Sequence, residues 1–143
     1  MVEAVLEDIA VAGDGNQFLV LLRTKDDDIL PIVIDALQAI SIAAGRNQEK
    51  IERPLTHDLL LSLIELFDAQ IDRIEITDLV DGTYYAILVL VRGGVQFEVD
   101  ARPSDAMALA VRVKAPIWIA EHVLEQNALT EDYSGGSGES FQA

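Results

Sequence analysis

A polar stretch at residues 53–58, with the sequence RPLTHD, contains side chains that can carry chemistry. His57 and Asp58 are expected in the first turn of a helix, where backbone N–H groups point outward and favour anions. There His57 can act as a general base or a metal ligand, and Arg53 can hold a phosphate. The structural alternative is that Thr56 caps the helix, Asp58 complements its dipole and His57 is merely exposed.

A second polar stretch, DARPSD at residues 100–105, lies where a strand is expected to end and a helix to begin. Asp100 and Arg102 share the polar face of the strand, and Ser104 and Asp105 follow at the helix start. Two carboxylates beside an arginine suit a divalent ion plus a phosphate, because Mg²⁺ and Mn²⁺ prefer oxygen ligands and the guanidinium is a planar fork. In the structural alternative Ser104 or Asp105 caps the helix, and Arg102 forms an ion pair with Asp100.

Asp78 is a third unusual carboxylate. It has the strand parity of Ile74 and Ile76, which look inward, so it is expected either at a β-bulge or paired with a cation. An ion pair with Arg102 or Arg53 explains the position of Asp78 as well as a catalytic role does. The candidate metal ligands are therefore Asp78, Asp100 and Asp105.

The elements that must position these residues follow from periodicity and turn signals. Strands are predicted over 2–12, 17–24, 29–34, 71–80, 83–92, 95–100 and 116–119. Helices are predicted over 35–44, 56–67, 102–113 and 121–126. The fold class is α+β, an antiparallel or mixed sheet packed against helices. The strands of 71–100 form a β-meander that we expect at the centre of the sheet.

Three helices have distinct apolar patterns. In the helix after the expected cap Asp35, the residues predicted to face inward are Leu37, Ile40 and Ala44. The helix from Thr56 has apolar residues at helical spacing: Leu59, Leu60, Leu63, Ile64 and Phe67. The helix that ends near Val113 is small or apolar all round, so it is expected to be deeply buried.

Length and composition restrict the class of protein. A chain of 143 residues predicts one domain, over residues 1–128, and the Ser/Gly-rich residues 129–143 predict a disordered tail. The absence of cysteine excludes disulfides and thiolate zinc sites. The first residues do not resemble a secretory signal, and no run is long and apolar enough to span a membrane, so a cytoplasmic location is expected.

The formal net charge of −15 argues against a tight non-specific grip on nucleic acid without divalent cations. A mean hydropathy of +0.25 is high for such a charged chain and indicates a homo-oligomer. The chain contains no phosphate-binding glycine loop, no dinucleotide fingerprint and no nucleophile elbow. These absences disfavour the common enzyme classes.

The order and spacing of several stretches resemble the bifunctional nuclease domain family. The stretches are RPLTHDLL at residues 53–60, ITDL with DGTYYA at 76–86, and DARPSDA at 100–106. The segments LPIVI at 30–34 and APIWI at 115–119 fit the same pattern, and the resemblance extends over about residues 1–127. It implies a nuclease that acts on DNA and RNA, and it assigns no catalytic residue.

The leading hypothesis is a metal-assisted phosphodiesterase acting on single-stranded or flexible nucleic acid. Asp100 and Asp105, with Asp58 or Asp78 nearby, would bind Mg²⁺ or Mn²⁺. His57 would handle the proton, and the scissile phosphate would be held by Arg102 and Arg53. The alternative is a non-catalytic homo-oligomeric module that regulates by binding a small anionic ligand or a protein, with a basic partner as a weaker variant.

Overall fold

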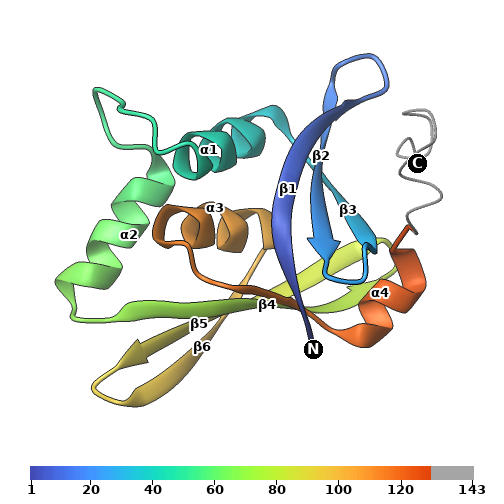
Figure 1. Cartoon of the computed structure of the whole chain (residues 1–143). Helices are drawn as coiled ribbons and strands as arrows, with labels where there is room; N and C mark the ends of the chain where they lie inside the picture. The colour runs from blue at the N-terminus through green and yellow to red at the C-terminus, as the bar shows by residue number, and fades with distance from the viewer. Residues whose placement is uncertain (130–143) are drawn as a thin grey trace.

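The computed structural model describes residues 1–129, so the tail predicted over 129–143 lies outside the described residues except for Leu129. In chain order the elements are β1 (Val2–Ala12), β2 (Gln17–Thr24), β3 (Ile29–Ile34), α1 (Ala36–Arg46), α2 (Thr56–Leu66), β4 (Gln70–Val80), β5 (Thr83–Arg92), β6 (Val95–Ala101), α3 (Pro103–Val113), β7 (Ile117–Ile119) and α4 (Glu121–Asn127). Figure 1 shows their arrangement. None of the described helices is long and apolar enough to cross a bilayer.

The strands form one seven-stranded sheet in the order β3-β2-β1-β7-β4-β5-β6. All neighbours are antiparallel except β4 and β7, which are parallel. The predicted α+β class is confirmed, with one difference in arrangement. The meander β4-β5-β6 forms one side of the sheet, and the three-residue strand β7 lies in the middle. Such a short strand gives no sequence signal that it joins two larger halves.

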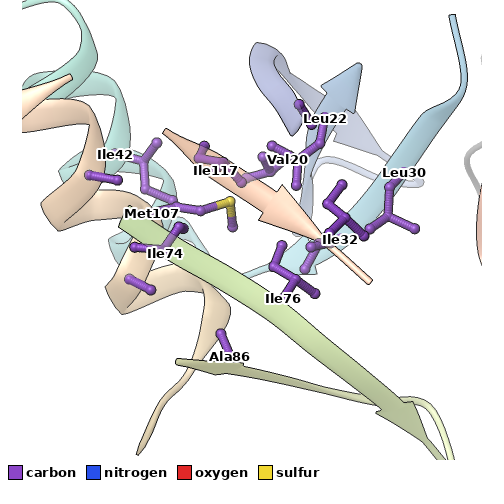
Figure 2. Packing of buried hydrophobic residues seen from close by; sticks show 14 of the residues in the cluster. Val20, Leu22, Leu30, Ile32, Ile42, Ile74, Ile76, Ala86, Met107 and Ile117 are labelled. Atoms are coloured by element: carbon purple, nitrogen blue, oxygen red, sulfur yellow. The ribbon is translucent and has the colours of Figure 1, made fainter. Parts of the chain in front are cut away.

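Helix α3 fills the angle between the two halves of the sheet, as Figure 1 shows. Its small residues let the backbones of α1 and β4 approach closely. Met107 is fully buried among side chains that include Ile42 of α1, Ile74 of β4 and Ile117 of β7, as seen in Figure 2. The expected deep burial of this helix is confirmed, and α3 therefore fixes the positions of both neighbouring helices.

The predicted inward face of α1 is only partly right. Ala44 is buried as predicted, but Leu37 and Ile40 are 79% and 58% exposed, because Ala39 and Ile42 face the core in their place. On α2 and at its end, most of the apolar residues at helical spacing are exposed as well, by 39% to 62%: Leu59, Leu60, Leu63 and Phe67. The helical periods were right, but no neighbouring element of the described chain covers these faces. The result is an unusual amount of apolar surface around α1 and α2.

The cap of α2 also differs from the prediction. Thr56 is the first residue of the helix, and the N-cap position belongs to Leu55. The backbone N–H of Leu55 donates to Asp58 Oδ2 at 2.8 Å. An acidic side chain at the third helical position can reach back in this way, so Asp58 rather than Thr56 satisfies the helix start. By contrast, the predicted cap Asp35 is confirmed, since its Oδ1 accepts from the N–H of Gln38 at 2.8 Å.

Candidate functional site

The first turns of α2 and α3 meet, and this brings the two polar stretches of the sequence together. His57 Nε2 lies 2.8 Å from Asp105 Oδ1, and Arg102 Nε donates to Asp105 Oδ2 at 2.8 Å. His57 is buried, with 8% of its surface exposed, so the interpretation that it is merely an exposed residue is wrong. Both oxygens of Asp105 are therefore engaged, one by the imidazole and one by the guanidinium.

Ser41 and Arg112 complete this site, and the sequence analysis missed both. Ser41 Oγ on α1 lies 2.6 Å from His57 Nδ1. Arg112 on α3 donates to Asp58 Oδ1 at 2.8 Å, to the carbonyl of Ser41 at 3.0 Å and to Ser41 Oγ at 3.3 Å. The sequence did contain a signal for both residues: each is a polar residue on the side of its helix that faces the core. Because buried polar groups need partners, such residues are candidates for a site.

The contacts around His57 favour one tautomer of its ring. Arg112 can only donate, so Ser41 Oγ accepts from it and is left to donate its own hydrogen to His57 Nδ1. An ionised Asp105 can only accept, so the hydrogen of the neutral ring lies on Nε2. Both ring nitrogens are thus occupied. His57 orients the carboxylate of Asp105, and Asp105 presents its remaining lone pairs outward.

The carboxyl groups of Asp58 and Asp105 both have a lowered pKa. For Asp58 the hydrogen bond from Arg112 is the main cause, and it outweighs the opposite effect of burial. For Asp105 burial acts to raise the pKa, but the hydrogen bonds from Arg102 and His57 together outweigh it, so the pKa is lowered overall. A carboxyl with a lowered folded-state pKa stabilises the fold above its unfolded pKa. That contribution is lost as the pH falls through the folded pKa.

Acid is therefore expected to destabilise the protein through this site. The free energy of unfolding should decline as the pH falls below about 4 to 5, where the carboxyls of the unfolded chain begin to bind protons first. Asp58→Asn removes one of the two groups and should make the decline shallower. Urea unfolding of both proteins across the acid range measures this, and two parallel profiles would contradict it.

Arg112 lies where α1 and α3 approach each other closely. Gly45 on α1 faces α3, and a Cβ added there would lie 2.5 Å from Arg112 Nη1 and 2.9 Å from Arg112 Cγ. Glycine is therefore required for the buried guanidinium to reach Ser41.

Gly45→Ala is expected to destabilise the protein. In an ordinary helix this change stabilises by about 0.5–1 kcal/mol. Here it overpacks a buried side chain that is already held by hydrogen bonds, which costs about 1–3 kcal/mol and outweighs the propensity gain. Thermal unfolding measures the sign, and a rise in Tm for Gly45→Ala would contradict the close approach of the two helices.

The polar cluster lies at a groove of about 980 Å³ between α1, α2, α3 and the sheet. Asp105, Arg102, His57 and the exposed Asp100 line it. Its other walls are largely apolar and include Leu37, Ile40, Leu60, Leu90 and Val99. The groove thus offers the guanidinium of Arg102 and the carboxylate of Asp105 beside an extended apolar surface.

Asp78 does not join this cluster. A β-bulge between Ile76 and Asp78 places Asp78 opposite Tyr85, on the other face of the sheet from Ile76 and Ala86. The bulge that the sequence allowed is therefore present. The partner of Asp78 is His122 Nε2 at 3.2 Å, and neither Arg102 nor Arg53. Since α3 packs on the face of Ile76, the sheet separates Asp78 from Asp105.

Several other sequence interpretations are corrected at α3. Arg102 occupies the N-cap position without a side-chain cap hydrogen bond, so neither Ser104 nor Asp105 caps the helix. Pro103 begins the helix and needs no cap for its nitrogen. Arg102 pairs with Asp105, and not with Asp100 as the structural alternative expected. Arg53 is exposed before α2 and does not line the groove.

The described residues contain no group of three or more His, Cys, Asp or Glu side chains that could hold a metal ion. Of the three candidate ligands, only Asp100 and Asp105 line the groove. Mg²⁺ is commonly bound by one or two carboxylates together with waters and substrate phosphates. Asp100 alternates with Val99 and Ala101 along β6, so its carboxylate points to the face of the sheet away from α3. Asp105 alone therefore fits a cation that takes its other ligands from waters and a bound phosphate.

The fold and the site define a small α+β domain with a His-Asp-Arg cluster at the meeting of two helix N-termini. A family model described as the bifunctional nuclease domain matches residues 20–132. The chain belongs to the bifunctional nuclease domain family, as its sequence motifs implied.

The relatives divide into two groups. An uncharacterized protein of Mycobacterium tuberculosis is 41% identical over 122 residues, which cover 85% of this chain and 73% of the relative. "Bifunctional nuclease 1" of Oryza sativa subsp. japonica is 29% identical over 115 residues, covering 77% of this chain and 35% of the relative. "Bifunctional nuclease 1" of Arabidopsis thaliana is 26% identical over 121 residues, covering 81% and 37%. The chain thus spans little more than a third of the plant proteins.

Proposed function

We propose that this chain hydrolyses phosphodiester bonds in single-stranded or flexible DNA or RNA, at the end of the groove where Asp105 lies. The observation that carries the proposal is the carboxylate of Asp105, held between His57 and Arg102 and facing an open groove. The names of the plant relatives support the same reaction class. A flexible strand is proposed as the substrate because it can bend to bring a phosphate to Asp105 within a groove that is walled by α1, α2, α3 and the sheet.

Each side chain of the cluster has a role in this proposal. The side chain of Arg102 is 70% exposed, and only its Nε donates to Asp105, so its terminal nitrogens can grip a phosphate. The ionised Asp105 accepts a proton from the attacking water, and His57 holds the carboxylate in place. Arg53, exposed before α2, can contact the next phosphate of a longer strand.

A divalent cation, Mg²⁺ or Mn²⁺, belongs to the proposal as well. Asp105 would hold it together with waters and oxygens of the substrate phosphate. When bound, it would supply positive charge to the phosphate and offset the net charge of −15 that otherwise repels nucleic acid.

The test is a cleavage assay on purified protein with single-stranded DNA and RNA. Cleavage is expected with Mg²⁺ or Mn²⁺ and should cease in EDTA, because without the cation the carboxylate of Asp105 and the substrate phosphate repel each other. Arg102→Met should raise KM more than it lowers kcat, since it removes a phosphate contact. Absence of cleavage, or equal cleavage by wild type and Asp105→Asn, would refute the proposal.

A non-catalytic module is the second candidate. The exposed apolar residues of α1 favour it, because Leu37 and Ile40 are more exposed than side chains of a lone domain need to be. In that case Arg102 would bind a small anionic ligand or a partner's carboxylate, and Asp105→Asn would change stability only. The same assay separates the two candidates.

A further inference from the structure

Strand β6 forms one edge of the sheet, and the described chain leaves that edge unprotected. All seven residues of β6 pair with β5, and no described strand lies on the other side. Six of the seven are exposed, and Val95, Phe97 and Val99 remain 55%, 49% and 42% exposed. An edge strand with open backbone groups and an apolar face is a template for another strand.

The opposite edge, β3, has the protection that β6 lacks. Pro31 in the middle of β3 has no N–H to offer, and proline within a sheet is typical of an edge strand. Leu129 pairs with Ile29 through two backbone hydrogen bonds of 2.8 and 2.7 Å. The carbonyl of Pro31 also accepts a hydrogen bond from Tyr84. The two edges of one sheet thus differ, and only β6 is available for pairing.

The turn before β6 fixes which of its backbone groups point outward. Gly93 and Gly94 both have positive φ, 56° and 79°, as a type I′ turn requires. The residues that close such a two-residue hairpin, Arg92 and Val95, form a hydrogen-bonded pair. Since hydrogen-bonded pairs alternate along an antiparallel ladder, the odd-numbered residues of β6 bond to β5. The N–H and C=O groups of the even-numbered residues Gln96, Glu98 and Asp100 therefore point away from the sheet.

We propose that two copies of this chain associate by antiparallel pairing of β6 with β6, about a two-fold axis at Phe97. In this register the outward groups of Gln96 bond to those of the partner's Glu98, and the reverse. Phe97 faces the partner's Phe97 as a non-hydrogen-bonded pair, where side chains are closest. Val95 faces the partner's Val99, so the apolar face of each strand is covered by its own copy.

Charge disfavours the registers on one side of this one. A two-fold axis at Glu98 would place two carboxylates directly opposite, and an axis at Val99 would place Glu98 opposite Asp100. Like charges in directly opposed positions destabilise a sheet. The axis at Phe97 instead pairs each Glu98 with an uncharged Gln96, and Asp100 with Gly94. An axis at Gln96, on the other side, has no such conflict; it would place Phe97 opposite the partner's Val95, and the Phe97→Cys cross-link below distinguishes the two.

A strand of a different protein is the other occupant to consider. Such a strand would need to match the spacing of apolar and acidic residues in β6, and it would lack the self-complementarity of two identical strands.

The dimer can be tested apart from the proposed nuclease activity. Asp105 and Arg102 lie on α3 and at its start, outside the paired strand, although Val99 and Asp100 of β6 also line the groove. Each copy has a net charge of −15, so long-range repulsion opposes association and salt should strengthen it. The measurements below are therefore made at 0.5 M NaCl, where the screening length is about 4 Å.

Phe97→Cys tests the interface and its register, because the chain has no cysteine of its own. Opposed Cα atoms in a non-hydrogen-bonded pair are about 4.5 Å apart, within the range of a disulfide. Oxidation is expected to yield at least about tenfold more cross-linked dimer than the control Glu98→Cys, whose copies would lie about 9 Å apart. A second control is Val33→Cys, 52% exposed on the protected edge β3.

Sedimentation of the wild-type protein and of two variants completes the test. A dimer is expected for wild type, with Phe97→Asp shifted to monomer and Val33→Asp unchanged. A monomeric wild type would overturn the proposal. So would a dimer that Phe97→Asp leaves intact, and so would equal cross-linking by Glu98→Cys, which would mean a different register. Cleavage activity is not a readout here, so failure of this proposal and failure of the proposed function are distinguishable.

Discussion

Replacing Asp105 by asparagine is expected to lower the rate of nucleic-acid cleavage by about 100- to 10,000-fold, the range found when a positioned acid–base group is removed. Asparagine keeps the shape of the side chain and can still accept from His57, but it is not a base. The loss should appear in kcat, because Arg102 remains to bind the phosphate.

The fold should survive this change. Asp105 is in the first turn of α3, where its interaction with the helix dipole contributes about 0.3–1 kcal/mol, and its ion pair with the largely exposed Arg102 contributes little more. The unfolding temperature should therefore fall by only a few degrees.

Asp78→Asn is the matched control. Asp78 also pairs with a histidine, His122, but both are exposed and Asp78 lies on the other face of the sheet. Cleavage by Asp78→Asn should equal that of wild type. If both variants cleave at the wild-type rate, the activity comes from elsewhere; if both lose it equally, the groove is not the site.

Replacing Arg112 by alanine is expected to destabilise the protein by about 3 kcal/mol, the lower end of the range for a buried ion pair, because Arg112 is buried but Asp58 is 32% exposed. The side chain of Arg112 is 6% exposed and makes hydrogen bonds to Asp58, to Ser41 and to the carbonyl of Ala108. Its removal leaves these acceptors without a donor in a region that water enters poorly.

Urea unfolding of Arg112→Ala measures this loss, with Arg73→Ala as the control. Arg73 also makes two ion pairs, with Asp72 and Glu75, but its side chain is 26% exposed. Its removal should cost at most about 1 kcal/mol. Equal losses for the two variants would mean that burial of the Arg112 network does not matter for stability.

Removing the charge of Asp58 from a protein that already lacks Arg112 should restore part of the loss. In Arg112→Ala the carboxylate is left without its cation, whereas asparagine needs none. The double variant Arg112→Ala with Asp58→Asn is therefore expected to be more stable than Arg112→Ala alone. This coupling identifies the ion pair itself, apart from any effect of lost packing.

Much of the secondary structure follows from local sequence. The Asp35 cap with Gln38, the Asp81-Gly82 turn between β4 and β5, and the burial of α3 are determined by residues that lie close together in the chain. Hydrophobic periodicity indicated every strand and helix to within a few residues. The sequence also singled out His57, Asp105 and Arg102, because acids, imidazole and guanidinium at helix starts are more than packing needs.

The tertiary structure decided which residues become partners. His57 bonds to Ser41 and Asp105, 16 and 48 residues away, and Arg112 bonds to Asp58 across 54 residues. Those distances depend on how α1, α2 and α3 pack, and a period along one helix does not specify its neighbours. For the same reason Leu37 was expected to be buried and is exposed.

Sequence by itself therefore determined the elements, the α+β class, the family and the residue types of the site. Packing decided the rest: that β7 joins the two halves of the sheet, that a bulge directs Asp78 away from the groove, and that β6 is left at an open edge. The physical reason is the separation along the chain of the residues that interact. Caps, turns and periodicity are set by neighbours within about four residues, whereas sheet order and buried polar networks are set by contacts between distant segments.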